Sequence, residues 1–468
     1  MLLGERRRNL REAATLVTAS GLFAVVAAVL LPAVRAGARP RLELVEVLPG
    51  LELAFALEPL GLVFALVASG LWILTSIYAI GYMRGHGEDH QTRFFVCFAL
   101  AIAGALGVAF SANFFTLFVF YEAITLSTYP LVTHSGSEKA MRSGRVYLGI
   151  LMGTSIAFLL FALVWTQLAA GTTEFRPGGI LAGKVSDARL PILLALFAFG
   201  TAKAALMPFH RWLPAAMVAP TPVSALLHAV AVVKAGVFTL TKVVVYVFGL
   251  DLLRGTGAAQ WLVAVAAFTL LSASVVALFQ DNLKRRLAYS TISQLAYIVL
   301  GAALVSERAV VGAGLHIVTH AFGKITLFFC AGAILVGAHR AEISRLDGLG
   351  WRMPWTFGAF AVGSLSIIGI PPFAGAWSKW LLAGGALDSD NAPILGLYML
   401  SSLLAIGYLM PVIGRAFARP SPEEDPESPH EVHEPLLCVL PPVLTAAGCL
   451  ALFFAADPLV ALLEGMLP

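Results

Sequence analysis

The chain has 468 residues, of which 59% are hydrophobic and only 12% charged, and its mean hydropathy is +0.85. This composition excludes an ordinary soluble globular protein and is typical of a polytopic helical membrane protein. The formal net charge of +4 says little about partners, and the 4 cysteines, which form no CxxC pair, favour neither a metal site nor a disulfide framework.

Hydrophobic runs of membrane-spanning length, about 17–25 residues, divide the chain, and we predict an all-α polytopic fold of about thirteen transmembrane helices. The start of the chain is polar and basic, and the run after it is long enough to span, so a cleavable signal peptide is not expected. The predicted spans lie near residues 15–35, 58–83, 94–111, 113–133, 145–170, 190–213, 221–249, 260–280, 288–305, 311–338, 354–384, 394–417 and 435–456.

The lysines and arginines between these spans predict the orientation of the chain. If the N-terminus is cytoplasmic, most of them fall in cytoplasmic loops, for example at residues 6–8, 139–145 and 284–286. Cytoplasmic loops of membrane proteins carry such an excess of positive charge. We therefore expect a multi-pass protein of the cell inner (plasma) membrane, with its N-terminus in the cytoplasm and its C-terminus outside.

Residues 200–222 are the most informative stretch. Lys203 lies near the middle of an apolar run, and Pro208 and Pro214 interrupt the helix soon after it. In hydrocarbon, a broken backbone is tolerated where it is buried in protein or lines a wet cavity. A charge and a break together predict a polar path through the membrane, and the alternative is a lysine that snorkels to the interface.

A second interrupted helix occurs in the other half of the chain, where Pro371 and Pro372 precede Lys379. Paired interrupted helices in corresponding positions indicate inverted repeats around a pathway at the membrane midplane. We place the two repeats at 94–250 and 260–417. The remaining segments are N-terminal helices at 1–93, an acidic loop at 418–434 and a C-terminal helix at 435–468.

The residues at 420–435 are acidic, rich in proline and too polar to span a membrane. His430 and His433 could bind a metal there, but a solvated surface loop is favoured, so no metal site is predicted. The chain has no phosphate-binding GxxxxGK[ST] loop, no dinucleotide fingerprint and no cysteine cluster for iron–sulfur. We therefore expect no catalytic chemistry, no cofactor and no nucleic-acid partner for this chain.

Titratable side chains inside the predicted spans form an unusual set. A charged side chain at mid-membrane costs about 2.5–3.5 kcal/mol on insertion scales, so such groups are usually functional. Glu122 is the one acid at the middle of a predicted span, whereas Glu58 is expected near the interface. The others are Lys203, Lys234, Lys242, Lys324 and Lys379, together with His228, His316 and His320.

This set favours protons over Na⁺ as the transported ion. Burial disfavours the charged forms of lysine and glutamate, so both can exchange protons near neutral pH. Glu122 is the obvious counter-ion for Lys203, and Lys242, near a helix end, either joins the path or snorkels. A sodium site needs hard oxygen ligands, and one glutamate among several lysines is a poor supply of them.

Spacing along one helix predicts a central relay. His316, His320 and Lys324 are four residues apart, so they form one stripe of a helix. The stripe could carry water and protons, or it could be hydrogen-bonding glue between helices. His228 and Lys234 share a helix but stand on nearly opposite sides of it, so we expect them to bridge different neighbours.

Six stretches of the sequence resemble the antiporter-like subunits of respiratory complex I and of Mrp cation/proton antiporters. They are FVFYEAITLSTYPLV, TAKAALMPFHRWLP, PTPVSALLHAVAVVKAG, LAYSTISQLAYIVLG, HIVTHAFGKITLFFCAGAI and GIPPFAGAWSK. The similarity runs from about Glu58 to Arg415, in the order found in the family. Within it, the D-type component of the Mrp antiporters, or the corresponding complex I chain, is the nearest.

The resemblance implies a fold of fourteen helices with two inverted five-helix repeats, each holding a broken helix. It also implies a proton pathway in which Lys203 is the pumping lysine and Lys234 connects the halves. The implied pathway residues are Glu122, Lys203, His228, Lys234, His316, His320, Lys324 and Lys379.

The chain departs from the family pattern at both ends. Its predicted spans lack the first helix of the family, and Met1 falls where the loop after that helix should be. We expect either a shortened member or a start codon assigned late. The chain stops soon after its last helix, without the long lateral helix of the largest complex I antiporter-like subunit, which argues against a role as a mechanical connector.

These observations predict a proton-translocating subunit of a hetero-oligomeric membrane complex, in the first place an Mrp-type Na⁺/H⁺ antiporter module in which a partner subunit moves Na⁺. One alternative is a subunit of a redox-driven pump, of the complex I (NADH:quinone oxidoreductase) or membrane-bound hydrogenase type. Another is a membrane subunit that energises an inorganic-carbon uptake complex. A purely structural scaffold is least favoured, because idle lysines at mid-membrane are costly.

Overall fold

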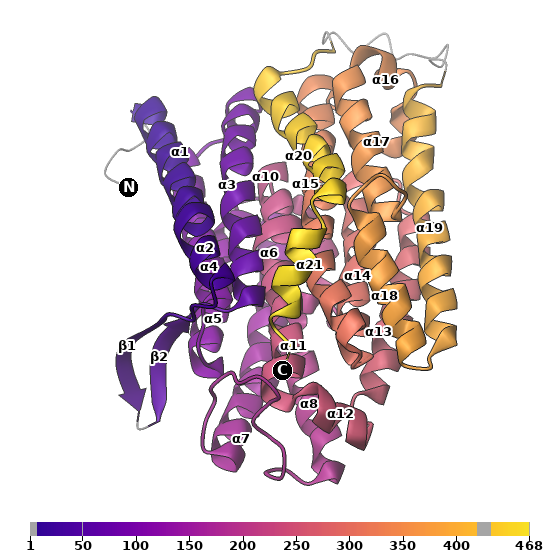
Figure 1. The fold of residues 1–468 in the computed structure, drawn as a ribbon. Coiled ribbons are helices and arrows are strands. Elements are labelled where there is room, and N and C mark those ends of the chain that lie inside the picture. The colour runs from indigo at the N-terminus through magenta and orange to yellow at the C-terminus, as the bar shows by residue number, and fades with distance from the viewer. Residues whose placement is uncertain (1–6, 49, 419–431, 468) are drawn as a thin grey trace.

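The computed structural model describes residues 7–48, 50–418 and 432–467. It is a bundle of long helices that run roughly along one axis (Figure 1). We call the end at which α1 (Arg8–Val25) and α20 (Leu436–Phe454) begin the upper end, as in Figure 1, and the opposite end, which carries a small hairpin, the lower end.

The N-terminal part packs one largely exposed helix against the bundle. α1 continues through a π-helical turn (Val26–Leu30) into α2 (Leu31–Arg35), and this helix lies against α3 (Pro59–Gly85). At the upper end, the Arg11 guanidinium bonds Gln91, and the Arg84 guanidinium pairs with Glu12. The next helices are α4 (Gln91–Ala109), α5 (Phe114–Val132), α6 (Glu138–Thr154) and α7 (Leu160–Ala170), the last two joined by a π-helical turn (Ser155–Leu159).

A two-stranded antiparallel hairpin at the lower end was not predicted. β1 (Arg41–Leu48) pairs with β2 (Leu51–Ala56), and the register places Arg41 opposite Ala56. The Asn113 side chain donates to the Glu52 carbonyl at 2.8 Å and ties the hairpin to the start of α5. The alternation of apolar and acidic residues in RLELVEVL is a strand signal, but it lies outside the runs of membrane-spanning length on which the prediction was based.

Residues 221–248 form the centre of the bundle, and all of them are buried. A helix that is apolar on all sides belongs in such a position. It consists of α10 (Thr221–Ala225), a π-helical turn (Leu226–Val230), α11 (Val232–Lys242) and a second π-helical segment (Val243–Phe248). α15 (Glu307–Ala338) runs beside it and also contacts α17 (Pro354–Ile368), α18 (Gly375–Asp388) and α20.

The remaining elements complete the two halves of the chain. They are α8 (Leu190–Gly200), α9 (Trp212–Ala215), α12 (Leu250–Thr256), α13 (Gln260–Leu278), α14 (Leu283–Ala303), α16 (Leu349–Arg352), α19 (Ala392–Ala416), α21 (Asp457–Glu464) and the short 3₁₀ turns Asp187–Arg189, Ala202–Ala204, Ala216–Val218 and Ile343–Arg345.

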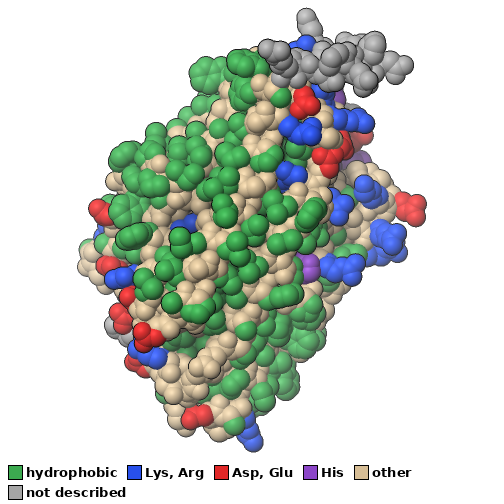
Figure 2. Space-filling model, turned by 90° about the vertical axis from the view of Figure 1, so that its right-hand side faces the viewer, with side chains coloured by type: hydrophobic (Ala, Val, Ile, Leu, Met, Phe, Trp, Pro, Cys, Tyr) green, Lys and Arg blue, Asp and Glu red, His purple; other side chains and the backbone are tan. Residues whose placement is uncertain are grey.

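The predicted all-α, multi-pass class is confirmed. Ten helices in the described ranges are long and apolar enough to cross a membrane, and others are shorter, interrupted or more polar. Figure 2 shows hydrophobic side chains over most of the visible face, with most of the charged ones toward its margins. The number thirteen and the segment boundaries stay predictions, and most of the acidic loop, including His430, lies outside the described residues.

Candidate functional site

Each half of the chain has a helix break that carries a lysine, fully buried at Lys203 and half-buried at Lys379. The first break begins before Lys203 and not at Pro208, where the sequence placed it. α8 ends at Gly200, and Lys203 follows in the 3₁₀ turn Ala202–Ala204. The Trp212 indole donates to the Ala202 carbonyl at 2.9 Å and so satisfies one backbone group that the break has freed. In the second half, α17 ends at Ile368 and α18 begins at Gly375, with Lys379 in its first turns.

Gly236 lets the central helix approach the first break closely. A Cβ atom at this position would lie 2.3 Å from the Lys203 carbonyl carbon and 2.3 Å from the Ala204 nitrogen. Any side chain there would therefore push α11 away from the turn that carries Lys203. The glycine is required by packing, because it brings the helix that bears Lys234 against the broken segment.

α5 holds the buried Lys203 side chain. Its Nζ donates to the Tyr121 carbonyl at 2.8 Å and to Thr125 Oγ1 at 2.6 Å, and it lies 3.2 Å from the centre of the Tyr121 ring. Because residues 121 and 125 share one helix face, the neighbouring Glu122 points elsewhere. Both Glu122 oxygens are buried without a hydrogen bond, and no ion pair joins Glu122 to Lys203 among the residues described. Its role as counter-ion stays a prediction.

A direct contact connects the two halves at the centre. Lys234 Nζ lies 2.6 Å from His320 Nδ1, and both side chains are buried. The His320 ring stacks on that of His316, with 5.8 Å between the ring centres. The structure therefore brings together three of the predicted pathway residues from α11 and α15.

The contacts of His316 continue this series of buried side chains toward the second helix break, between α17 and α18. Its Nδ1 lies 2.9 Å from Ser378 Oγ, and its Nε2 lies 3.1 Å from Gln294 Oε1. Ser378 immediately precedes Lys379 in α18, and the Tyr297 ring stacks on His316 at 5.6 Å. Three helices, α14, α15 and α18, thus meet around one histidine ring.

Lys379 is the last residue in this series of side chains and lies beside the Tyr297 ring. Its Nζ lies 4.7 Å from the centre of that ring and donates to Ser402 Oγ at 2.9 Å and to the Ile368 carbonyl at 3.0 Å. The carbonyl belongs to the last turn of α17, so the break itself supplies an acceptor. Lys379 also lines an open, largely apolar groove of about 870 Å³ between α18 and α19.

Two predicted pathway residues lie beside this chain. Lys324 donates to Ser290 Oγ at 2.6 Å and to the Leu287 carbonyl at 3.3 Å, so its hydrogen bonds lead to α14 and away from His320. His228 is fully buried, and neither of its ring nitrogens has a hydrogen-bond partner among the residues described. The Phe328 ring of α15 lies 4.5 Å away. Lys234 also contacts α15, through His320, so the two residues face the same helix and do not bridge different neighbours as the sequence led us to expect.

Lys242 does not snorkel. It is fully buried, and its Nζ lies 2.6 Å from Glu58 Oε1 and 2.8 Å from the Ser111 carbonyl. The sequence left the role of Lys242 open and indicated an interfacial Glu58, without pairing them. The pairing of Lys242 with Glu58 could have been predicted, because the topology puts the start of α3 and the end of α11 at the same end of the bundle.

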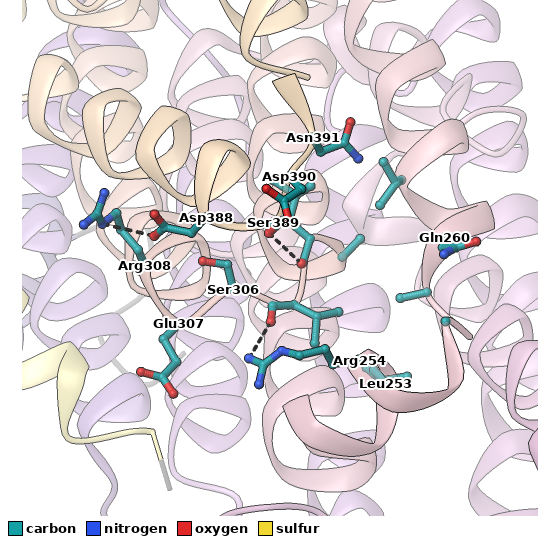
Figure 3. Close-up of a pocket in the computed structure, with 16 residues that line it drawn as sticks. Leu253, Arg254, Gln260, Ser306, Glu307, Arg308, Asp388, Ser389, Asp390 and Asn391 are labelled. Carbon is teal, nitrogen blue, oxygen red and sulfur yellow. Dashed lines mark hydrogen bonds and ion pairs between the residues drawn. The ribbon is translucent and has the colours of Figure 1, made fainter. Parts of the chain in front are cut away.

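The lower end also carries a polar pocket of about 720 Å³ between three loops (Figure 3). Arg254 donates to the Val305 carbonyl at 3.0 Å, and the Arg308 guanidinium lies 3.3 Å from Asp388. These contacts satisfy the two guanidinium groups locally. No group of three or more His, Cys, Asp or Glu side chains in the described part of the chain is arranged to hold a metal ion.

The fold and this interior define a multi-pass membrane protein with a buried chain of titratable side chains. Residues 111–405 match a family model described as NADH:quinone oxidoreductase/Mrp antiporter, and residues 50–95 match one described as the N-terminus of chain 5 of NADH-ubiquinone oxidoreductase (complex I). The chain belongs to this family of antiporter-like membrane subunits, which confirms the resemblance seen in the sequence.

Individual relatives come from more than one kind of complex. The chain is 33% identical over 358 residues to NADH-quinone oxidoreductase subunit N of Desulforudis audaxviator, covering 74% of this chain and 69% of that one. It is 35% identical over 370 residues to a Rhizobium meliloti protein described as a probable K⁺/H⁺ antiporter subunit (type A/B), covering 77% and 36%. The chain spans half or less of the length of several curated relatives.

A solved structure of the Mrp complex from Dietzia sp. DQ12-45-1b contains a chain with the same fold. The TM-score is 0.85 with 21% sequence identity, and the match covers 98% of this chain and 92% of that one. At this level of identity the likeness supports the fold alone. The fold therefore extends over almost the entire chain.

Proposed function

We propose that the chain is a proton-translocating subunit of a multi-subunit membrane complex. The observation that carries the proposal is the series of proton-exchanging groups that runs from the buried Lys234 through His320 and His316 to the half-buried Lys379. Burying such groups is costly, and in membrane proteins they mark ion pathways and proton relays. Lys234, His320 and His316 are buried, and the half-buried Lys379 is held by hydrogen bonds to Ser402 and to the Ile368 carbonyl.

The geometry supports a stepwise transfer at the centre. The Lys234 ammonium can pass a proton to His320 Nδ1 over 2.6 Å, and His320 can release one from its other nitrogen, which has no hydrogen-bond partner among the described residues. The 5.8 Å between the ring centres of His320 and His316 is bridged by water or by a rotation of one ring. Ser378 and Tyr297 then lie between His316 and Lys379.

Lys203, in the first half of the protein, supplies protons to this series of side chains. Its ammonium points toward α5, while its backbone lies against Gly236 of α11, two residues beyond Lys234. We propose that a change in the charge of Glu122 releases Lys203 from Tyr121 and Thr125. The lysine can then deliver its proton toward Lys234. The two repeats, 94–250 and 260–417, accordingly meet at the Lys234–His320 contact.

We propose that the upper end faces the cytoplasm and that the protein resides in the cell inner membrane. Arg84, Arg93, Lys139 and the basic residues 284–286 lie in or beside the loops at that end. The positive-inside rule then places the N-terminus in the cytoplasm and the C-terminal helix end outside. This is the orientation expected from the sequence.

The complex that we propose first is an Mrp-type antiporter module, in which protons cross this chain and Na⁺ crosses a partner subunit. The similarity to a probable K⁺/H⁺ antiporter protein and the shared fold with a chain of an Mrp complex support this choice. The second candidate is a redox-driven pump, which the similarity to an NADH-quinone oxidoreductase subunit N favours. In both, neighbouring membrane subunits are the partners and this chain contributes the proton path.

The test is proton transport by the assembled complex in proteoliposomes, followed with a pH-sensitive dye. Lys203→Ala and Glu122→Ala should each abolish transport while the variants still assemble with their partners. Lys184→Ala, which removes an exposed lysine from the loop before α8, serves as the control and should leave transport unchanged. Full transport by Lys203→Ala or Glu122→Ala in an assembled complex would overturn the pathway.

A further inference from the structure

The loop between α3 and α4, residues 86–90, gathers titratable side chains at the upper end. Glu88 stands between two histidines: Oε1 lies 3.4 Å from His86 Nδ1, and Oε2 lies 3.7 Å from His134 Nε2. The Glu88 side chain is 18% exposed, so the cluster reaches water. Asp89 and His90 complete the loop, and both are exposed.

His134 makes this cluster a built site rather than a row of surface charges. Its side chain is only 2% exposed, and its Nδ1 has no hydrogen-bond partner among the described residues. Arg93 donates to the His134 carbonyl at 2.9 Å, and the Phe94 ring meets the imidazole edge-on at 5.8 Å. The ring is therefore held with one nitrogen toward Glu88.

A cavity of about 350 Å³ opens beside the cluster at the same end. Glu88 and Asp89 line it together with Arg8 and Arg84. This cavity gives water direct access to the carboxylate. The cluster thus has an aqueous side and a buried side, which a group that takes protons from solution requires.

The surroundings shift the pKa of Glu88 upward and the pKa of His134 downward. Burial raises the pKa of Glu88, Asp89 adds to this effect, and His86 and Lys284 oppose it. Burial lowers the pKa of His134, and the positive charge of Arg93 adds to this effect. Glu88 therefore binds a proton more readily at neutral pH than a surface glutamate does. Asp89 and His90 also act on His134, in opposite directions.

A polar strip leads from this cluster into the bundle. Lys284, whose charge interacts with that of Glu88, donates to the Ala219 carbonyl at 2.6 Å, just before α10. Thr221, Ser224 and His228 then follow at spacings of three and four residues on one helix face. Their side-chain oxygens and ring nitrogens are buried with no hydrogen-bond partner in the described part of the chain.

Buried polar atoms of this kind are normally satisfied, often by ordered water. The strip ends at His228, whose ring lies 4.5 Å from that of Phe328 in α15, the helix that also carries His316 and His320. The strip therefore runs from the upper end of the bundle to the helix that carries the central histidines. A simpler explanation is that the Glu88 contacts only hold two loops together. That explanation does not account for the buried polar atoms of the strip, which have no hydrogen-bond partner among the described residues.

We propose that His86, Glu88 and His134 form a proton-collecting site that feeds the buried chain through Thr221, Ser224 and His228. This rests on the proposed function and names the inlet of the same pathway. Glu88 takes a proton from water in the cavity, and the two imidazoles share it before it moves inward. No bond other than O–H and N–H bonds forms or breaks.

The test compares Glu88→Gln with the unmodified complex in proteoliposomes, measuring initial proton uptake from the upper-end side between about pH 6 and about pH 9. Glutamine keeps the shape of the side chain and can still form hydrogen bonds, but it cannot take up and release a proton. We expect transport to be near normal at the acid end, where protons are abundant. At the alkaline end it should be reduced roughly tenfold, because the local capture of protons is lost.

The control is Glu138→Gln, which removes an exposed acid at the same end of the bundle and should change nothing at any pH. Uptake by Glu88→Gln that equals the unmodified rate throughout, or that falls by one constant factor at every pH, would overturn the inlet. Lys203→Ala, measured alongside, separates the two proposals: if it abolishes transport while Glu88→Gln shows no pH-dependent loss, only the inlet fails. If Lys203→Ala transports normally, the proposed function itself fails.

Discussion

Lys234 Nζ and His320 Nδ1 lie 2.6 Å apart in the centre of the bundle, and they come from opposite halves of the chain. Neither is exposed to the surface, and each is the other's side-chain hydrogen-bond partner among the described residues. A lysine can donate to a neutral imidazole but repels a protonated one. The contact is therefore favourable only when the pair holds a limited number of protons, which makes it responsive to proton occupancy.

Gly236 should be sensitive to the smallest possible substitution. Gly236→Ala places a methyl group within 2.3 Å of the backbone at Lys203 and Ala204, so α11 must shift. We expect a loss of stability of about 1–3 kcal/mol, as in other overpacked interiors, and slower proton transport because Lys203 and Lys234 move apart. The midpoint of thermal unfolding in detergent measures the first effect.

A matched control for that substitution is Gly149→Ala. Gly149 lies within α6, and a Cβ there meets nothing within 4 Å. Replacing a helical glycine by alanine should then stabilise the protein by up to about 1 kcal/mol. Equal effects of the two substitutions would contradict the close approach at the first break.

The fold could be predicted from the sequence more fully than the contacts of the site. The prolines and the lysines within apolar runs indicated that each half contains a helix break. Each such residue has a large free-energy cost in hydrocarbon, and it can be recognised from the local sequence alone. The hairpin at Arg41–Ala56 was missed, because it lies outside any run of spanning length. Its position depends on contacts such as that between Asn113 and Glu52.

The partners of the buried lysines were not predictable, because tertiary packing selects them. Lys203 bonds Tyr121 and Thr125 rather than Glu122, one residue away on α5. Lys324 lies on the predicted stripe, yet its Nζ turns to Ser290 on the neighbouring helix. Helical spacing showed which side chains share a face but not which helix that face meets.

The ion pair of Glu58 and Lys242 should stabilise the lower end of the bundle, and the free energy of unfolding should fall by different amounts when one or the other partner is removed. The Lys242 side chain is 1% exposed and that of Glu58 15% exposed. Glu58→Leu leaves an ammonium group buried without its counter-ion and should cost about 3–5 kcal/mol. Lys242→Leu leaves a carboxylate that reaches solvent and should cost less.

The double variant Glu58→Leu/Lys242→Leu tests whether the two groups act as a pair. Because it leaves no unpaired charge, it should be more stable than Glu58→Leu alone. Thermal unfolding of all three variants in the same detergent gives the comparison. Losses that simply add would show that the two side chains contribute independently.

The docking of the hairpin should depend on pH. Hydrogen bonds from Arg176 and from Arg41 hold the pKa of the Glu174 carboxyl below its ordinary value, and Arg41 also bonds Glu52 in β2. A carboxyl group whose pKa is lowered by folding contributes stability above its unfolded pKa. That stability is lost as the pH falls through the folded pKa.

Hydrogen exchange of the β1 and β2 amides, corrected for the intrinsic pH dependence, measures this effect. Protection should decrease in the acid range in which Glu174 becomes protonated. Glu174→Gln, which cannot titrate, should show weaker protection at neutral pH and a smaller change on acidification. An unaltered pH profile in that variant would refute the role of the Glu174 contacts.

Proton transport by His320→Asn in the assembled complex tests the central claim most directly. The asparagine side chain can still accept or donate a hydrogen bond near Lys234, but it cannot take up and release a proton. We predict an assembled complex whose proton transport in proteoliposomes falls to the level of empty vesicles. Transport at the unmodified rate would contradict a proton path through the Lys234–His320 contact.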